Sequence, residues 1–216
     1  MTGLPVNRIL HGDCVNLMRE LPSESVDFVL TDPPYLVRYR SRDGRTVAND
    51  NNDRWLKPSF AEMFRLLKTG AFCVSFYGWH RVDVFVDAWK AAGFRIVGHI
   101  VFRKRYASGS RFLRYTHEQA YLLAKGEVTP PEHAIADVID WTYTGNRLHP
   151  TQKPVGSLKP LVEAFCPPRG IVLDPFSGSG SSLVAAQELG RDFLGIELDV
   201  EHHRTACERV ARPLAA

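Results

Sequence analysis

Apolar residues recur at helical spacing in six segments of the chain. The clearest segment runs from Arg81 to Ala92, where apolar side chains fall at positions i, i+3, i+4 and i+7 (Val82, Phe85, Val86, Trp89). Gly93 follows this segment and is typical of a helix end. The same spacing predicts further helices at residues 14–20, 59–68, 156–165, 180–189 and 200–210. We expect Ser59 to cap the helix at 59–68 and Gly70 to end it.

Short runs of nearly continuous apolar residues occur between these helices, and such runs are typical of strands buried on both faces of a sheet. They predict seven strands, at residues 8–13, 26–30, 71–76, 95–102, 120–124, 171–173 and 193–196. Strands that alternate with helices favour an α/β fold with a mostly parallel sheet and helices on both faces. The strands at 95–102 and 120–124 have no helix between them and predict one antiparallel element. Residues 36–57 and 126–152 show neither the helical nor the strand spacing of apolar residues. The first of these segments is long enough to predict a functional loop.

The composition fits one soluble α/β domain. The 216 residues are 44% hydrophobic and 24% charged, and a chain of this length can bury a substantial core. No apolar run approaches the ~18 residues of a membrane helix, and no apolar signal segment opens the chain, so we expect a cytoplasmic protein. Four scattered cysteines (Cys14, Cys73, Cys166, Cys207) and histidines without ligand spacing predict buried thiols and no metal site.

A basic segment connects the two strands of the antiparallel element. Residues 103–114 hold five basic side chains and no acid, whereas the whole chain has a net charge of only +3. Aromatic residues are interleaved with the basic ones. The segment is compatible with a solvated loop, but it also has the features of a surface that contacts phosphates and offers rings for stacking.

A turn of small residues follows the strand at 171–173 and precedes a helix. Asp174 ends the strand, and Gly178 and Gly180 allow the backbone to turn tightly and approach a ligand. Glu197 ends the next strand, where a carboxylate in a nucleotide-binding α/β unit meets ribose hydroxyls. The turn lacks the Gly-Lys-Ser/Thr of a phosphate-binding loop, so S-adenosylmethionine, which has a ribose and no phosphate, fits it. Alone, the turn is equally compatible with a simple connection.

A second acidic turn, Asp32-Pro33-Pro34-Tyr35, follows the strand at 26–30. A turn of this kind could act on an exocyclic amine of a nucleobase. Such an amine is a poor nucleophile because its lone pair is delocalised into the ring. The Asp32 carboxylate and the Pro33 carbonyl can accept its two hydrogens and stabilise the positive charge that develops on attack. The prolines fix φ and hold these acceptors in place, and Tyr35 can stack on a base that has left the duplex. Such a direct methyl transfer needs neither a covalent intermediate nor a metal.

The two acidic turns together resemble the motifs of amino-group (adenine-N6 or cytosine-N4) DNA methyltransferases. Residues 32–35 resemble the catalytic motif and residues 174–180 the cofactor motif, and their order is the permuted order of the β class. Further matches are His11-Gly12-Asp13-Cys14, His149-Pro150-Thr151-Gln152-Lys153-Pro154 and Gly195-Ile196-Glu197, so the resemblance spans residues 9 to about 199. It implies one Rossmann-like methyltransferase domain with S-adenosylmethionine as cofactor.

The resemblance also implies roles for residues of this chain. The implied catalytic residues are Asp32, Pro33, Pro34 and Tyr35. The implied cofactor-binding residues are Asp13, Cys14, Asp32, Thr151, Lys153, Asp174, Phe176, Ser177, Gly178, Ser179, Gly180, Glu197 and Leu198. Among these, Asp13 would lie near the adenine, Glu197 at the ribose and Lys153 at the methionine carboxylate. His117-Glu118, in Thr116-His117-Glu118-Gln119, resembles a weaker motif near the flipped base, but alone it is typical of a surface pair and is not counted as catalytic.

The resemblance further implies double-stranded DNA as the partner and adenine N6 as the target, because an Asp is commoner than a Ser at the head of the motif in adenine enzymes. Cytosine-N4 methylation is the alternative; methylation of RNA or of a protein glutamine, and a non-catalytic nucleic-acid-binding module, are further ones. The expected DNA-binding residues are Arg38, Arg40, Arg103, Lys104, Arg105, Arg111 and Arg114.

The expected domain covers residues 1–216, with a catalytic half (9–125), a short recognition region (103–148) and a cofactor half (149–210). Larger relatives carry an inserted recognition domain after the weaker motif, and this chain has only about thirty residues there. We therefore expect recognition to come from loops or from a second subunit in a homodimer. The expected setting is the nucleoid of a bacterial cell or a phage-infected one, with a cognate restriction enzyme as a candidate partner.

Overall fold

Strands and helices alternate along most of the chain in the computed structural model, which describes residues 3–38, 44, 48–109, 112–143, 145 and 152–212. The strands are β1 (Arg8–His11), β2 (Val26–Thr31), β3 (Leu67–Phe76), β4 (Arg95–Lys104), β5 (His117–Ala124), β6 (Val138–Trp141), β7 (Ile171–Asp174) and β8 (Asp192–Glu197). The helices are α1 (Cys14–Arg19), α2 (Leu56–Leu66), α3 (Val82–Ala92), α4 (Val155–Phe165), α5 (Ser181–Glu188) and α6 (Val200–Val210), with a short 3₁₀ helix, η1 (Trp79–Arg81). The predicted residues Arg40, Arg111, His149, Pro150 and Thr151 lie outside the described ranges.

The strands form one mixed sheet in the order β1-β8-β7-β2-β3-β5-β4-β6. Only β5 runs antiparallel to its neighbours, β3 and β4, and the other neighbouring strands are parallel. The mostly parallel sheet and its single antiparallel element are therefore confirmed. The predicted count of seven strands is wrong, because β6 adds an eighth strand at the edge beside β4.

The eighth strand lies in the segment 126–152, which the sequence predicts to be irregular. Its four residues, Val-Ile-Asp-Trp, bury only Trp141 fully, while Val138 and Asp140 are exposed. A run this short, half exposed at a sheet edge, does not produce the continuous apolar signal of a central strand.

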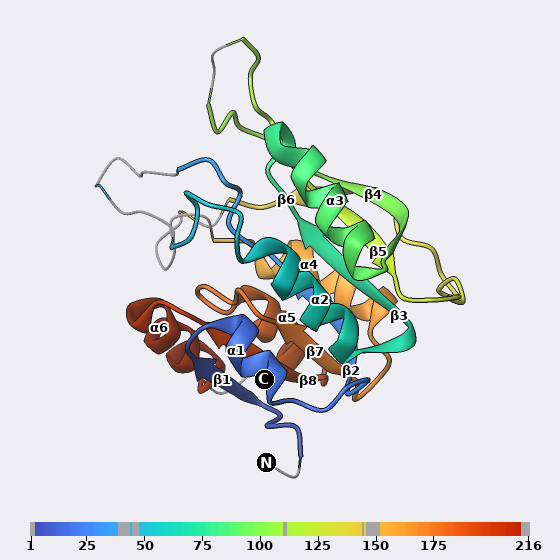
Figure 1. Cartoon of the computed structure of the whole chain (residues 1–216). Helices are drawn as coiled ribbons and strands as arrows, with labels where there is room; N and C mark the ends of the chain where they lie inside the picture. Colours follow the sequence, from blue (N-terminus) through green and yellow to red (C-terminus); the bar gives the residue numbers. More distant parts are fainter. Residues whose placement is uncertain are drawn as a thin grey trace.

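Three helices cover each face of the sheet (Figure 1). On one face, apolar residues of α1, α2 and α3, such as Met18, Phe60 and Trp89, pack on alternate strand residues such as Val29. On the other face, α4, α5 and α6 pack on the intervening residues, including Phe28. This alternation along β2 follows from the two-residue period of a strand and explains why its apolar run is continuous. The prediction of helices on both faces is confirmed. None of the helices in the described ranges has the length and apolar character needed to cross a membrane.

The helix predicted at 59–68 begins and ends earlier than expected. Trp55 precedes its first residue, Leu56, and the Trp55 indole donates hydrogen bonds to the carbonyls of Asn49 and Asn52 at 3.0 and 2.8 Å. Ser59 is therefore not an N-cap: it is buried inside the helix, where its hydroxyl donates to the Leu56 carbonyl. No side chain in the described ranges caps α2, and the Trp55 indole instead fixes the loop that precedes the helix.

Gly195 of β8 provides a test of how tightly the sheet packs beneath α5. A Cβ at this position would lie 2.4 Å from Leu183 Cδ1 and 3.3 Å from Ile9 Cγ1. We expect Gly195→Ala to lower the free energy of unfolding by about 1–3 kcal/mol, because buried neighbours must shift. Gly156 in the first turn of α4 has nothing within 4 Å of such a Cβ, so Gly156→Ala is the matched control and should be neutral or slightly stabilising. Urea unfolding measures both, and equal midpoints would contradict the close packing.

Candidate functional site

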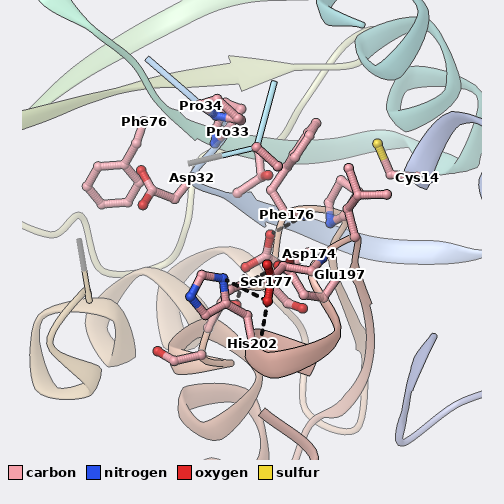
Figure 2. Close-up of a pocket in the computed structure, with 18 of the residues that line it drawn as sticks. Cys14, Asp32, Pro33, Pro34, Phe76, Asp174, Phe176, Ser177, Glu197 and His202 are labelled. Atoms are coloured by element: carbon pink, nitrogen blue, oxygen red, sulfur yellow. Dashed lines mark hydrogen bonds and ion pairs between the residues drawn. The ribbon is translucent and has the colours of Figure 1, made fainter. Parts of the chain in front are cut away.

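The carboxyl ends of four parallel strands meet at one pocket. It is lined by residues that follow β1, β2, β7 and β8, together with the segment before α2 and Lys153. Ligands of open α/β sheets bind at this end of the strands. In Figure 2, Asp32, Pro33 and Pro34 lie on one side of the pocket and Ser177, Glu197 and His202 on the other, with Phe176 between them.

The turn between β7 and α5 forms the floor of one side of the pocket. Gly180 has φ +78°, and a Cβ there would lie 3.1 Å from the Ala206 Cβ of α6, so both the backbone conformation and the space favour glycine. Arg209 of α6 donates to the Ser179 carbonyl (2.6 Å) and to the Ser181 hydroxyl (3.2 Å). This arginine fixes the turn from behind and was missed by the sequence analysis, because it lies in an ordinary amphipathic helix with no motif.

Glu197 is held at the end of β8 by two backbone donors. The Gly178 N–H donates to its Oε2 at 2.7 Å and the Asp199 N–H to its Oε1 at 2.8 Å. The carboxylate thus links the glycine turn to the start of α6, and its remaining lone pairs lie beside the pocket that Glu197 lines. Leu198, the next residue, is 42% exposed at the same pocket.

Asp13 and Cys14 contribute to the pocket from the end of β1. Asp13 is the N-cap of α1, and its Oδ1 accepts a hydrogen bond from the Asn16 N–H at 3.0 Å. Cys14 is buried, and burial together with the Asp13 charge raises the pKa of its thiol to about 12. Its thiol is therefore uncharged at neutral pH, and Cys14 has the character of an apolar lining residue.

Asp174 is buried beneath the glycine turn. Its Oδ1 accepts from the Phe176 N–H at 3.1 Å, and its Oδ2 accepts from the Ser182 hydroxyl. Burial raises the pKa of Asp174 to about 7, against the opposing effect of these hydrogen bonds. A carboxyl group with these partners fixes the shape of the turn.

The Asp32-Pro33-Pro34-Tyr35 turn follows β2 directly and faces Lys153. The Lys153 ammonium lies 2.6 Å from Asp32 Oδ2 and donates to the Tyr35 hydroxyl at 3.2 Å. Among the described residues, Asp32 Oδ1 has no hydrogen-bond partner although it is buried. Gly78 permits a close approach here, because a Cβ at residue 78 would lie 2.6 Å from the Tyr35 carbonyl oxygen.

Two protonation effects follow from the burial of this turn. Burial raises the pKa of Asp32, and the Lys153 ammonium opposes that rise. Burial, followed by the Asp32 and Glu118 charges, raises the pKa of Tyr35 well above its usual range, so the phenol stays neutral at physiological pH.

A segment before α2 covers part of the pocket. Asp50 and Trp55 are buried and line it, and the Asp50 carboxylate accepts from the Val37 N–H at 3.2 Å. The Trp55 ring meets the Phe176 ring edge-on at 5.1 Å. The sequence predicts only a functional loop here, because polar residues without a period carry no signal for the contacts that bury Asp50 and Trp55.

The basic segment has two kinds of cationic side chain. Arg103, Arg105 and Arg114 are exposed, as is Arg38 in the loop after the catalytic motif. Lys104 is different: its side chain is 4% exposed and its ammonium is paired with Glu118 of β5. A strand alternates its side chains between two faces, so Lys104 points inward where its neighbours point outward. The surface role expected for Lys104 therefore does not fit the structure, and neither does the reading of Glu118 as half of a surface pair.

The sequence and the fold both match known proteins. A family model described as DNA methylase, covering the N6/N4 class, matches residues 26–208. The chain belongs to this DNA methylase family. The match covers β2 to α6 and includes both acidic turns.

Two curated relatives match nearly the whole chain. YubD of Escherichia coli (strain K12), which carries the provisional description of a methylase, is 54% identical over 206 residues, covering 95% of this chain and 91% of YubD. The type II methyltransferase M.HinfI of Haemophilus influenzae is 26% identical over 249 residues, covering 95% of this chain and 68% of M.HinfI.

Solved structures show the same fold. The M1.HpyAVI–SAM complex has a TM-score of 0.77 at 24% identity and covers 95% of this chain and 99% of its own. The PvuII DNA methyltransferase, described as cytosine-N4-specific, has a TM-score of 0.76 at 14% identity and covers 96% and 87%. The expected Rossmann-like methyltransferase fold is therefore confirmed.

The Asp174 carboxyl provides a pH-dependent test of the site. Its pKa in the folded protein, about 7, exceeds the ordinary 3.8, so between these values the folded state binds more protons than the unfolded chain. The contribution of Asp174 to the free energy of unfolding is therefore largest below its pKa in the unfolded chain. This contribution falls as pH rises through its pKa in the folded protein.

Asp174→Asn cannot ionise, so it should not lose this contribution. We expect the free energy of unfolding of Asp174→Asn, relative to the wild-type protein, to be higher at about pH 8 than at about pH 5. Urea unfolding at the two pH values measures this difference. A difference that stays constant with pH would show that the carboxyl is not held in this low-dielectric environment.

Proposed function

We propose that this protein is a site-specific DNA methyltransferase that transfers the methyl group of S-adenosylmethionine to an exocyclic base amine, adenine N6, of a flipped-out base in double-stranded DNA. One observation supports this most directly: Oδ1 of the Asp32 carboxylate is buried and has no hydrogen-bond partner among the described residues, and Asp32 lines the pocket that also contains the glycine turn. An acceptor for an amine hydrogen thus adjoins a cofactor-type pocket.

The pocket residues fit the cofactor by their chemistry. Glu197 offers carboxylate oxygens for ribose hydroxyls, Asp13 and Cys14 offer a polar and an apolar wall, and Phe176 offers a ring. When bound, S-adenosylmethionine supplies an electrophilic methyl group on its sulfonium. The proposed binding set is Asp13, Cys14, Asp32, Thr151, Lys153, Asp174, Phe176, Ser177, Gly178, Ser179, Gly180, Glu197 and Leu198.

The catalytic turn acts on the base. Asp32 Oδ1 and the Pro33 carbonyl accept the two amine hydrogens, which draws electron density onto the nitrogen and stabilises its positive charge as the new bond forms. Two consecutive prolines hold these acceptors before the substrate arrives. The neutral Tyr35 ring offers a stacking face for a base outside the duplex.

The target base is proposed from the residue that heads the motif. Asp32 favours adenine over cytosine, but the same two acceptors suit the N4 amine of cytosine. Cytosine-N4 methylation is therefore the second candidate, and one sequencing experiment separates the two. Methyl transfer to RNA or to a protein glutamine would give no modified base in genomic DNA.

We propose that the exposed arginines of the basic segment contact DNA phosphates. Arg103 lies near the end of β4, and Arg105 and Arg114 lie on the connection to β5, where the exposed Trp79 ring stacks on Tyr115 with the ring centroids 6.2 Å apart. Arg38, Arg40 and Arg111 complete the proposed surface. Residues 9–125 would form the catalytic half, 103–148 the recognition region and 149–210 the cofactor half of one domain. We further propose a homodimer in the nucleoid of a bacterial or phage-infected cell, with a restriction enzyme as a candidate partner.

Expression in a methylation-deficient bacterium, followed by base-modification sequencing of the host genome, tests the proposed activity. We expect N6-methyladenine within one short motif. Asp32→Ala should remove the modification and lower transfer to purified DNA by at least about 100-fold, because the charge acceptor is lost. Asp32 is only one member of the proposed binding set, so the same variant should still bind S-adenosylmethionine in calorimetry, with at most a modest loss of affinity. Loss of binding with Asp32→Ala would mean that the roles of the two acidic turns are interchanged, and an unmodified genome would count against DNA as the substrate.

A salt titration tests the DNA surface. The Arg105 side chain is 87% exposed, and Arg105→Ala should reduce the dependence of log K on log salt by about one, because one phosphate contact is lost. Arg95 begins β4, whereas Arg105 follows the end of that strand; Arg95 donates to the Gly126 carbonyl and provides a charge-matched control. Arg95→Ala should leave the slope as it is. Equal slopes for Arg105→Ala and wild type would remove Arg105 from the DNA surface.

A further inference from the structure

The ammonium group of Lys153 occupies the interior of the catalytic end of the pocket. The residue is only 7% exposed. The rings of Tyr35, Phe76 and Trp141 surround the ammonium, with centroids 5.2, 4.8 and 5.8 Å from Nζ. Aromatic faces attract cations, so these rings stabilise an ammonium that has left bulk water. The three rings and the Asp32 carboxylate therefore both favour the charged form of the lysine side chain at this position.

The two oxygens of the Asp32 carboxylate have different surroundings. Oδ2 lies 2.6 Å from the Lys153 ammonium, whereas Oδ1 has no partner among the described residues. The ammonium also donates to the Tyr35 hydroxyl at 3.2 Å. These two contacts from one cation fix both the rotation of the carboxylate and the position of the phenol, three residues apart in the same turn.

We infer that Lys153 is a positioning residue that keeps Asp32 ionised and rotated so that Oδ1 faces the substrate amine. The inference rests on the proposed amine methylation. For Lys153 it replaces the cofactor contact of the proposed binding set, in which the same ammonium would lie on the methionine carboxylate. The two roles predict different effects: loss of a positioning residue lowers kcat at saturating cofactor, whereas loss of a cofactor contact weakens cofactor binding.

Ionisation matters because a protonated carboxyl would offer a donor where an acceptor is needed. The charged groups that face Asp32 are Lys153 before α4, Glu118 on β5 and Asp174 on β7, and the neutral Tyr35 hydroxyl adjoins them. Glu118 is itself paired with Lys104 on β4. Burial and the Glu118 charge disfavour the Asp32 carboxylate, and Lys153 is the cation placed directly on it.

The test compares Lys153→Met with two controls. Lys153→Arg keeps a charge at the site, and Lys159→Met removes a half-exposed lysine of α4 that pairs with Glu188. In apo protein with ¹³C-labelled aspartate carboxyls, assigned with Asp32→Asn, we expect the Asp32 titration to move to higher pH in Lys153→Met and to remain in place in Lys159→Met.

Steady-state kinetics supply the second readout. At saturating DNA and S-adenosylmethionine, Lys153→Met should lose at least about tenfold in kcat at neutral pH. Its loss of activity on the acid side should begin at a higher pH than in wild type, and Lys153→Arg should recover part of the rate. The dissociation constant for S-adenosylmethionine should stay within about twofold of wild type.

An unchanged Asp32 titration in Lys153→Met would overturn the inference. So would an unchanged kcat together with weakened cofactor binding, which would assign Lys153 to the methionine carboxylate. If Lys153→Met does not fold, Lys153→Gln removes the charge but retains a donor and gives the same comparison. The NMR titration uses no substrate, so absence of methyl transfer in wild type would count against the proposed function alone.

Discussion

The parallel pairing of β2 with β7 is the constraint on which the site depends. These strands lie far apart in the chain, yet Val29 is opposite Leu173 in the register. Because both strands run the same way, they end at the same edge of the sheet, and their terminal acids, Asp32 and Asp174, line one pocket. The order of the motifs along the chain therefore does not affect the geometry. What counts is that apolar helices cover both faces of the two central strands.

Three of the carboxylates that line the pocket, Asp32, Asp174 and Glu197, have different partners. Glu197 accepts from two backbone N–H groups, and Asp174 accepts from a backbone N–H and a hydroxyl. Backbone donors cannot move far, so these two acids define the shape of the glycine turn. Asp32 is balanced by a lysine side chain, which leaves one oxygen open. A carboxylate that accepts a hydrogen bond from a substrate needs an oxygen that is not already bonded to donors of the protein. A full set of internal donors would leave no such oxygen.

The sequence predicted the features that depend on local chemistry and missed those that depend on tertiary contact. Continuous apolar runs identified the central strands, and the resemblance of the two acidic turns to methyltransferase motifs identified the residues of the pocket. Strand β6 is too short and too exposed to carry one. The start of α2 depends on the Trp55 indole, which acts through carbonyls of the preceding loop. Lys104 belongs to a run of basic residues, and only the strand alternation of β4 shows that it points inward to Glu118.

Two contacts connect the catalytic half of the pocket to the cofactor half. The Lys153–Asp32 ion pair connects the chain before α4 to the turn after β2, and the edge-on contact of Trp55 with Phe176 connects the segment before α2 to the glycine turn. Trp55 and Phe176 pack in the apolar cluster on one face of the sheet, whereas the rings of Tyr35, Phe76 and Trp141 around Lys153 pack in the cluster on the other face. A ligand that orders the glycine turn therefore also constrains the segment that follows the catalytic motif. This coupling needs no separate hinge, because the contacts are made by side chains that already line the shared pocket.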